Sequence, residues 1–325
     1  MAVTLADVAR AAEVSTSTVS RALTRPDRVD ERTRTRVLDT VRVLGYRPNR
    51  AARSLITGRT GSIGVVVPDL TNPFFPDVVA GIQGRAHERA LTTLLADSGE
   101  DPDAERDLLA TLAPQVDGLI LCGSRLPGAE LAAAAGRSRI VLVNRAQPGL
   151  AAVTVDNGGG ARQAVEHLRA LGHRRIGLIP GPPTSHSARQ RSEGARRAAA
   201  DCGAELVELA PAPPTFDGGE DAADAVLRTG VSGVLTYNDA VAIGLMHRLR
   251  GYGVEIPAEL SVVGFDDVQV ARMACPPLTT LRFPRRDAGR LAVERLLHLI
   301  DGEPAEDPDP LPTQLVVRGS TSRHR

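Results

Sequence analysis

The sequence has few of the features that mark secreted or membrane proteins. It contains only three cysteines, Cys122, Cys202 and Cys275, which are too scattered for a disulfide framework or a Cys-x-x-Cys metal clip. No apolar run approaches the roughly 18 residues of a membrane span, and no basic segment followed by an apolar one opens the chain. We therefore expect a protein of the reducing cytoplasm with no membrane partner.

Signatures of enzyme chemistry are also missing. No GxGxxG, GxxxxGK[ST], GxSxG or HExxH pattern occurs, and none of the seven histidines stands at metal-ligand spacing from another. The adjacent carboxylates Asp266 and Asp267 could suggest a glycosidase, but neighbouring residues at a strand end point to opposite faces and cannot flank one bond. We expect no enzyme activity, no metal and no cofactor.

Lysine is absent, so the 39 basic residues that balance 39 acidic ones are all arginine. These charges are unevenly distributed along the chain. Residues 1–60 contain twelve arginines and six acidic residues, a net charge of +6, which leaves −6 for the rest. A basic head on an anionic body is typical of a protein that binds nucleic acid through one domain.

The length and composition indicate more than one globular unit. A chain of 325 residues exceeds what one hydrophobic core usually organises. Its content of 42% hydrophobic and 24% charged residues is ordinary for a globular protein. One small domain followed by a larger one fits both observations.

The first 45 residues have the pattern of three short helices. A first helix is expected over residues 4–12 and a second over 16–23, with Thr4 and Ser15 as N-caps. A third helix is expected over 30–45. Its buried stripe would consist of Val37, Leu38, Val41 and Leu44. The short turn between the first two helices predicts a helix-turn-helix.

The second helix would expose short hydroxyls and one guanidinium, at Thr16, Ser17, Ser20 and Arg21. Such side chains can approach base edges and phosphates closely in the major groove of DNA. The alternative is that the hydroxyls only cap the helix and that Arg21 is solvated. The rest of the sequence favours the DNA-binding interpretation.

Five motifs in order resemble the lactose-repressor (LacI/GalR) family over nearly the whole chain. They are VTLADVARAAEVSTSTVSRAL with YRPNRAARSLITGRTGSIGVVVPDLTNPFF, then SARQRSEG, TYNDAVAIG, SVVGFDD and PPLTTLRF. The resemblance implies a ligand-controlled bacterial transcription regulator, most often a repressor, that binds a palindromic operator as a dimer. It implies a small all-α helix-turn-helix head (1–48), a hinge (49–60) and a ligand-binding and dimerisation core (61–325).

By the same resemblance, Thr16 and Ser17 occupy the principal base-reading positions. The hinge, which starts at Asn49, would enter the central minor groove, with Leu55 as the apolar wedge that opens a base step. The other interpretation of Leu55 is an ordinary buried linker leucine. The DNA-contacting residues that we expect are Thr4, Ser15, Thr16, Ser17, Thr18, Ser20, Arg21, Asn49, Ala52 and Leu55.

From residue 62 onward, short apolar runs alternate with helical stretches, which is typical of parallel α/β sheets. The runs include residues 63–67, 119–121, 140–143, 176–179 and 234–235. We expect an α/β core of periplasmic-binding-protein type, with two interleaved Rossmann-like subdomains. Ligands of such sheets bind at the carboxyl ends of the strands.

All five phenylalanines fall in candidate loops or at strand ends, where a cleft for the apolar face of a sugar ring would use them as platforms. Hydrogen-bonding side chains follow several of the expected strands. The ligand-site residues that we expect are Asn72, Phe74, Phe75, Asn144, Arg145, Arg191, Phe216, Asn238 and Asp266.

The family resemblance assigns roles to part of this set. It implies that Arg191, Asn238 and Asp266 bind ligand hydroxyls and that Phe216 stacks on the ring. The alternative for Arg191 and Asp266 is a structural ion pair.

Two departures from the family pattern reduce the polarity of the cleft. Asn144 stands where many sugar-binding relatives have aspartate, and Phe283 replaces a commonly polar residue. We therefore expect an effector that is a sugar or a related small metabolite and that can carry an apolar substituent.

Two other classes of protein share parts of this pattern. A secreted sugar-binding protein would have the same core, but with a signal peptide and without the head. A constitutive architectural DNA binder would have the head but no use for a polar cleft. The sequence is equally compatible with an effector that releases DNA and one that recruits binding, and with repression or activation at a given promoter.

We expect a homodimer, because the residues after the last expected strand (315–317) lack the apolar heptads that tetramerise some relatives. The helix after Pro76 is a candidate for part of the dimer surface. Its apolar stripe consists of Val78, Val79 and Ile82, although a buried core stripe would look the same.

Overall fold

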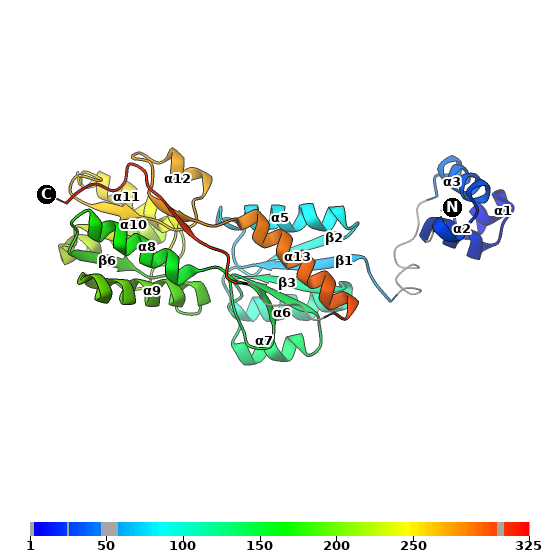
Figure 1. Cartoon of the computed structure of the whole chain (residues 1–325), viewed down its shortest axis with the longest axis horizontal. Helices are drawn as coiled ribbons and strands as arrows, with labels where there is room; N and C mark the ends of the chain where they lie inside the picture. Colours follow the sequence, from blue (N-terminus) through cyan, green and yellow to red (C-terminus); the bar gives the residue numbers. More distant parts are fainter. Residues whose placement is uncertain (1–2, 25, 47–57, 304–308, 325) are drawn as a thin grey trace. The chain divides into compact units, whose positions relative to one another are not determined.

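The computed structural model describes residues 3–24, 26–46, 58–303 and 309–324 (Figure 1). The chain divides into two compact units, Met1–Thr60 and Gly61–Arg325. The described part of the first unit is helical, and the second contains parallel sheets with covering helices, as the sequence predicts. No helix in the described residues has both the length and the apolar character that a membrane crossing requires.

The N-terminal unit consists of three helices and a 3-10 turn: α1 (Leu5–Ala11), α2 (Thr16–Thr24), η1 (Pro26–Arg28) and α3 (Glu31–Leu44). Thr4 begins α1 with a capping box, in which its hydroxyl accepts from the Asp7 N–H while the Asp7 carboxylate accepts from the Thr4 N–H. Gly45 ends α3 in the left-handed region, with φ of 63°. The helix bounds agree with the sequence prediction to within a residue or so.

The core of this unit contains one fully buried valine from each helix, Val8, Val19 and Val37. The expected stripe of α3 is wrong at Leu38, which is 40% exposed. Val37 already faces the core, and the next residue is rotated by about 100° around the helix axis. Val41 and Leu44, four and seven residues after Val37, return to the buried face and pack there.

Strands β1 to β5 form one parallel sheet in the spatial order β2-β1-β3-β4-β5. Their bounds are β1 (Ser62–Val67), β2 (Thr92–Asp97), β3 (Gly118–Cys122), β4 (Ile140–Val143) and β5 (Ala151–Val153). The connecting elements are α5 (Phe75–Glu88), α6 (Pro102–Leu112), η2 (Ala113–Gln115) and α7 (Gly128–Ala135). We call this sheet with these elements and α13 (Arg285–Asp301) the N-subdomain.

A second parallel sheet has the order β7-β6-β8-β9. Its strands are β6 (Arg175–Ile179), β7 (Glu205–Glu208), β8 (Gly233–Thr236) and β9 (Ser261–Val263). Its helices are α8 (Asn157–Ala170), α9 (His186–Cys202), α10 (Phe216–Thr229), α11 (Asp239–Gly251) and α12 (Gln269–Met273). An antiparallel pair, β10 (Thr280–Arg282) with β11 (Gln314–Val316), completes what we call the C-subdomain.

The two subdomains are interleaved along the chain. The chain passes between them after β5, after β10 and after α13. Figure 1 shows α13 beside α5 of the N-subdomain, although α13 follows the whole C-subdomain sheet in the sequence. Three connections of this kind permit a hinge motion between the subdomains.

Helix α5 buries its apolar stripe inside the N-subdomain. Val78 and Ile82 are fully buried and Val79 is 7% exposed, in the same core cluster as residues of α13. The stripe is therefore a buried core stripe, and the part of α5 in the dimer surface stays a prediction.

The contact between α5 and α13 requires glycine at two positions. A Cβ atom on Gly81 would overlap the backbone carbonyl of Arg286, and one on Gly289 would overlap that of Val78. The backbones of the two helices therefore approach more closely than any side chain permits.

We expect Gly81→Ala to lower the free energy of unfolding by about 3 kcal/mol, because a backbone carbonyl cannot move aside as a side-chain end can. Gly84 lies on the same helix with no atom near its Cβ position. Gly84→Ala is the matched control and should stabilise by up to about 1 kcal/mol through helix propensity. Equal urea midpoints for the two variants would contradict this account of the contact.

Candidate functional site

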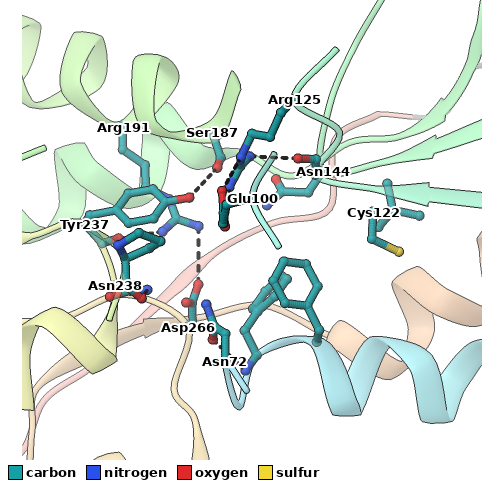
Figure 2. Close-up of a pocket in the computed structure, with 15 residues that line it drawn as sticks. Asn72, Glu100, Cys122, Arg125, Asn144, Ser187, Arg191, Tyr237, Asn238 and Asp266 are labelled. Atoms are coloured by element: carbon teal, nitrogen blue, oxygen red, sulfur yellow. Dashed lines mark hydrogen bonds and ion pairs between the residues drawn. The ribbon is translucent and has the colours of Figure 1, made fainter. Parts of the chain in front are cut away.

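A cavity lies where loops from both subdomains meet (Figure 2). Cys122 ends β3, Asn144 follows β4, Asn238 follows β8 and Asp266 lies beyond the end of β9. The site is therefore at the carboxyl ends of the strands, as the sequence predicts. The space inside it that the centre of a water molecule can occupy is about 20 Å³, far less than a sugar ring needs. Binding of a sugar-sized molecule thus requires the subdomains to separate.

Most of the residues predicted for the ligand site line this cavity. They are Asn72, Phe74, Phe75, Asn144, Arg191, Asn238 and Asp266. The structure does not bring Arg145 and Phe216 into the lining. Phe216 begins α10, is 39% exposed and packs on His247 with a centroid distance of 5.5 Å.

Arg191 of α9 is anchored by three hydrogen bonds. Its Nε donates to Asn157 Oδ1 (3.0 Å), Nη1 to the Tyr237 carbonyl (2.6 Å) and Nη2 to Asp266 Oδ1 (3.3 Å). The guanidinium carbon also lies 3.6 Å from the ring centroid of Phe265. The group is buried and fixed, so its remaining N–H donors can meet a ligand with little reorganisation.

Asp266 provides the carboxylate of the cavity. Burial raises its pKa to about 6, and the positive charges of Arg191 and Arg285 oppose this rise. Its backbone has a φ of 117°, a region that residues with a side chain rarely adopt. Such strain is typical of functional sites, where the surrounding structure holds the residue in place.

The neighbouring Asp267 points away from the cavity, as the sequence analysis argues. Its carboxylate accepts from Arg282 Nε (2.7 Å) and from Arg318 Nη2 (2.5 Å). Asp266 and Asp267 therefore have separate sets of partners and cannot act together on one bond.

Two of the five phenylalanines serve the cavity. Phe74 and Phe75 lie edge to face with centroids 4.8 Å apart and form the apolar wall. Phe265, which is not among the predicted ligand-site residues, is a fully buried core residue although it follows the end of a strand. Phe283 is 3% exposed and supports the wall from behind, 5.6 Å from Phe74.

Helix α2 presents the hydroxyl groups predicted for DNA contact. Thr16, Ser17 and Arg21 are exposed, and Arg21 folds back so that its Nη2 donates to Ser17 Oγ (3.2 Å). Ser15 caps the helix, because its Oγ accepts from the Thr18 N–H at 3.1 Å. The N-cap roles predicted for Thr4 and Ser15 are thus confirmed, and their contacts with DNA stay a prediction. Asn49, Ala52 and Leu55 lie outside the described residues.

Comparisons with known proteins match both units. Residues 4–49 match the family model described as bacterial regulatory proteins, lacI family, and residues 165–321 match a periplasmic binding protein-like domain. The HTH-type transcriptional repressor CytR of Escherichia coli (strain K12) is 35% identical over 98% of this chain and 96% of its own length. The chain belongs to the lacI family of bacterial regulatory proteins.

Solved structures agree with this assignment over both units. A lac repressor dimer bound to operator and the anti-inducer ONPF has a TM-score of 0.90 at 30% identity, covering 99% of this chain and 100% of that one. A complex of the transcriptional regulator CelR with cellobiose has a TM-score of 0.72 at 31% identity, covering 98% and 99%. The protein is a DNA-binding regulator of transcription.

In this lacI-family chain, Arg145 supports the cavity from behind. Its Nη1 donates to the carbonyl of Ser124 (2.6 Å), while the buried Glu105 accepts from the N–H of Arg125 (2.7 Å). This carbonyl and this N–H belong to the same peptide unit, so the Arg145 guanidinium and the Glu105 carboxylate bind that peptide from opposite sides. Arg145 thereby fixes the loop that brings Arg125 into the cavity.

Sequence reasoning missed several lining residues of this lacI-family core, among them Glu100, Arg125, Ser187 and Tyr237. Arg125 binds Glu100 through two hydrogen bonds of 2.6 and 2.9 Å. The Tyr237 hydroxyl is hydrogen-bonded to Ser187 (3.3 Å). Glu100, Arg125 and Tyr237 follow strands β2, β3 and β8, so the strand-end rule that found Asn144 could have found them too.

Asn157 was also missed, and it connects the two subdomains behind the cavity. Its Nδ2 donates to Asn144 Oδ1 (2.8 Å) and its Oδ1 accepts from Arg191. The side chain is 1% exposed. It follows β5 next to Asp156, and only the packed structure shows that its side chain lies between the two cavity walls.

Proposed function

We propose that this lacI-family regulator binds a pseudo-palindromic operator as a homodimer and that a small polyhydroxylated metabolite in the cavity controls the binding. The observation that carries the proposal is the buried Arg191–Asp266 pair at the edge of a cavity between two movable subdomains. The relatives point the same way, since CytR is called a repressor and CelR was solved with cellobiose. Repression is the outcome that we propose.

On the DNA side, we propose that α2 enters the major groove. Thr16 and Ser17 are exposed and have short side chains, so the helix can approach closely enough for their hydroxyls to contact base edges. Arg21 can exchange its hydrogen bond with Ser17 for one with a phosphate. The hinge residues Asn49, Ala52 and Leu55 would contact the minor groove. This activity takes place in the cytoplasm, where the bacterial chromosome lies.

On the effector side, the cavity offers matched charges. Arg125 is paired with Glu100 and Arg191 with Asp266, so a neutral ligand leaves no buried charge without a partner. The phenylalanine wall suits the apolar face of a ring, and the amides of Asn72, Asn144 and Asn238 add donors and acceptors. We propose a sugar or a sugar-bearing metabolite, and no catalysis, because Glu100 and Asp266 of the cavity are each held in an ion pair with an arginine.

The test is selection of genomic DNA fragments by the purified protein, followed by titration of the best fragment with and without a panel of sugars. A tightly bound palindrome whose affinity changes with one sugar supports both halves of the proposal. A sugar that binds with no enriched DNA sequence would favour a binding protein without a regulatory role. An enriched palindrome that no sugar affects would favour an architectural DNA binder.

Control by an effector requires reciprocity between the two sites. A sugar that weakens operator binding must itself bind the operator complex less tightly, by the same factor. Calorimetric titration of the sugar into the free protein and into the operator complex measures that factor. Equal affinities would reject the coupling.

We expect Leu55→Ala to weaken operator binding on the order of tenfold while leaving non-specific binding nearly unchanged, because a wedge acts only in the bent, specific complex. Fluorescence anisotropy on the selected operator and on a scrambled duplex compares the two. Arg59→Ala is the control for charge loss in the same segment and should weaken both affinities and the salt dependence. Parallel losses for Leu55→Ala on both duplexes would reject the wedge role.

The proposed dimer has a simple test. Sedimentation at micromolar concentration should give one species of twice the chain mass of 34.3 kDa. A stable tetramer would contradict the prediction.

A further inference from the structure

Arg285, the first residue of α13, contacts both subdomains with one nitrogen. Its Nη2 donates to Asp77 Oδ2 (2.8 Å) and to the backbone carbonyl of Asp267 (3.1 Å). Its Nε also donates to Asp77 Oδ2 (3.3 Å), and its side chain is 12% exposed. A charged side chain this deeply placed, with partners on two subdomains, fixes their relative position.

The two partners of Arg285 lie directly behind the two walls of the cavity. Asp77 is in the first turn of α5, which begins with Phe75 of the apolar wall. Asp267 follows Asp266 of the opposite wall and, like it, has a positive φ, of 50°. A shift of Asp266 therefore moves the carbonyl that Arg285 holds.

We propose that Arg285 is a positioning residue that clamps the two cavity walls together before any small molecule binds. The clamp accounts for a free space of only about 20 Å³ in a site built for ligands. It goes beyond effector binding, because it concerns the balance between closed and open cores in the free protein. An effector that enters between the walls has to work against this contact or replace it.

Neighbouring contacts do not duplicate the clamp. Arg286 also binds Asp77, through Nε at 3.2 Å, but it is 72% exposed and has no bond to the C-subdomain among the described contacts. The Asn157–Asn144 bond crosses between subdomains at the start of α8, on the other side of Arg191. Lysine at position 285 would keep the charge, but its ammonium ends one bond short of Nη2, the nitrogen that contacts both acceptors.

The experiment measures the distance between the subdomains by pulsed electron paramagnetic resonance. Spin labels are placed through Ala132→Cys on α7 and Ala200→Cys on α9, both exposed helical positions. Cys202 and Cys275 are first replaced by serine, while the buried Cys122 is kept. Labelled protein is diluted into an excess of unlabelled protein, so that only distances within one chain contribute.

The parent protein should give one narrow distance peak. Arg285→Met should broaden it and shift it away from the parent position, and Arg285→Lys should do so too, because the shorter lysine side chain ends one bond before the position of Nη2. Arg286→Met is the matched control, since it removes a neighbouring arginine from the same Asp77, and should leave the peak unchanged.

Two results would overturn the clamp. One is an unchanged peak in both variants at position 285, and the other is an equal shift in Arg286→Met. Thermal unfolding of each variant is recorded in parallel. Should Arg285→Met fail to fold, Arg285→Lys alone decides, because a parent-like peak in that variant would show that the longer reach of the guanidinium to both walls is not needed.

Discussion

Arg191→Met is expected to abolish the response to effector while the protein still binds its operator. The substitution leaves Asp266 as a buried carboxylate without its guanidinium and removes the donors nearest to it. Loss of one partner of a buried, hydrogen-bonded ion pair costs about 2 to 5 kcal/mol, which corresponds to a fall in sugar affinity of about 30-fold or more. Calorimetry with the sugar found in the panel measures the affinity, and anisotropy on the selected operator measures DNA binding.

The matched control is Arg196→Met, on the same helix α9. Arg196 makes a shorter ion pair with Glu208, at 2.6 Å, but its side chain is 50% exposed. A pair in solvent contributes at most about 1 kcal/mol, so this variant should bind sugar like the parent. If Arg191→Met kept parent-like sugar affinity, the pair with Asp266 would be purely structural, and the proposed effector site would have to lie elsewhere.

The sequence predicts the fold of this protein well because its signals are local. In the structure, Thr4 caps the start of α1 and Asp30 caps the start of α3, while Gly45 ends α3. The apolar runs of the parallel sheets are also short and continuous, since both faces of each sheet are covered by helices. The exception, Leu38, shows that an apolar residue beside a stripe is not part of it.

The cavity is predictable only in part, because strand-end position indicates proximity but not direction. Asn144 and Arg145 are adjacent after β4, yet only Asn144 reaches the cavity, while Arg145 turns back to hold the next loop. Phe265 and Asp266 are adjacent in the same way, and Phe265 enters the core under Arg191. The backbone twist at such positions, including a φ of 57° at Asn144, is set by tertiary contacts that no local pattern encodes.

The aromatic content shows the same limit. A position in a loop or at a strand end does not show whether a phenylalanine faces the cavity, since Phe265 and Phe283 are buried and Phe216 is 39% exposed. Phe283 therefore serves as packing for Phe74 rather than as a ligand platform. Two hydrogen bonds join the subdomains, one between Asn157 and Asn144 and one between Arg285 and Asp267. The partners in each bond are separated in the sequence, and no motif indicates that they meet. They follow from the packed structure alone.

Asp266→Asn is expected to change the pH dependence of stability. Burial raises the pKa of Asp266 to about 6 from an ordinary value of 3.8, despite the charges of Arg191 and Arg285. Between these two values the folded protein holds a proton that the unfolded chain has lost, so stability falls as the pH rises through this window. Asparagine does not titrate. The free energy of unfolding of the variant, relative to that of the parent, should therefore increase by about 2 to 3 kcal/mol between pH 4 and pH 7.5.

Urea unfolding of both proteins at the two pH values isolates this effect, because most other groups titrate alike in both. Asp239 is the exception, because burial and then the charge of Asp266 raise its pKa well above the ordinary range. Asp266→Asn removes that charge, so Asp239 ionises more readily. This adds to the relative stability of the variant at high pH. A difference between variant and parent that is the same at both pH values would contradict a raised pKa at Asp266.

Sugar affinity should respond oppositely: it should strengthen in the parent as the pH rises through 6 and the carboxylate ionises to accept hydroxyl protons. In Asp266→Asn the sugar affinity should stay weak at every pH. This result would separate the contribution of the carboxylate to sugar binding from its destabilisation of the folded protein.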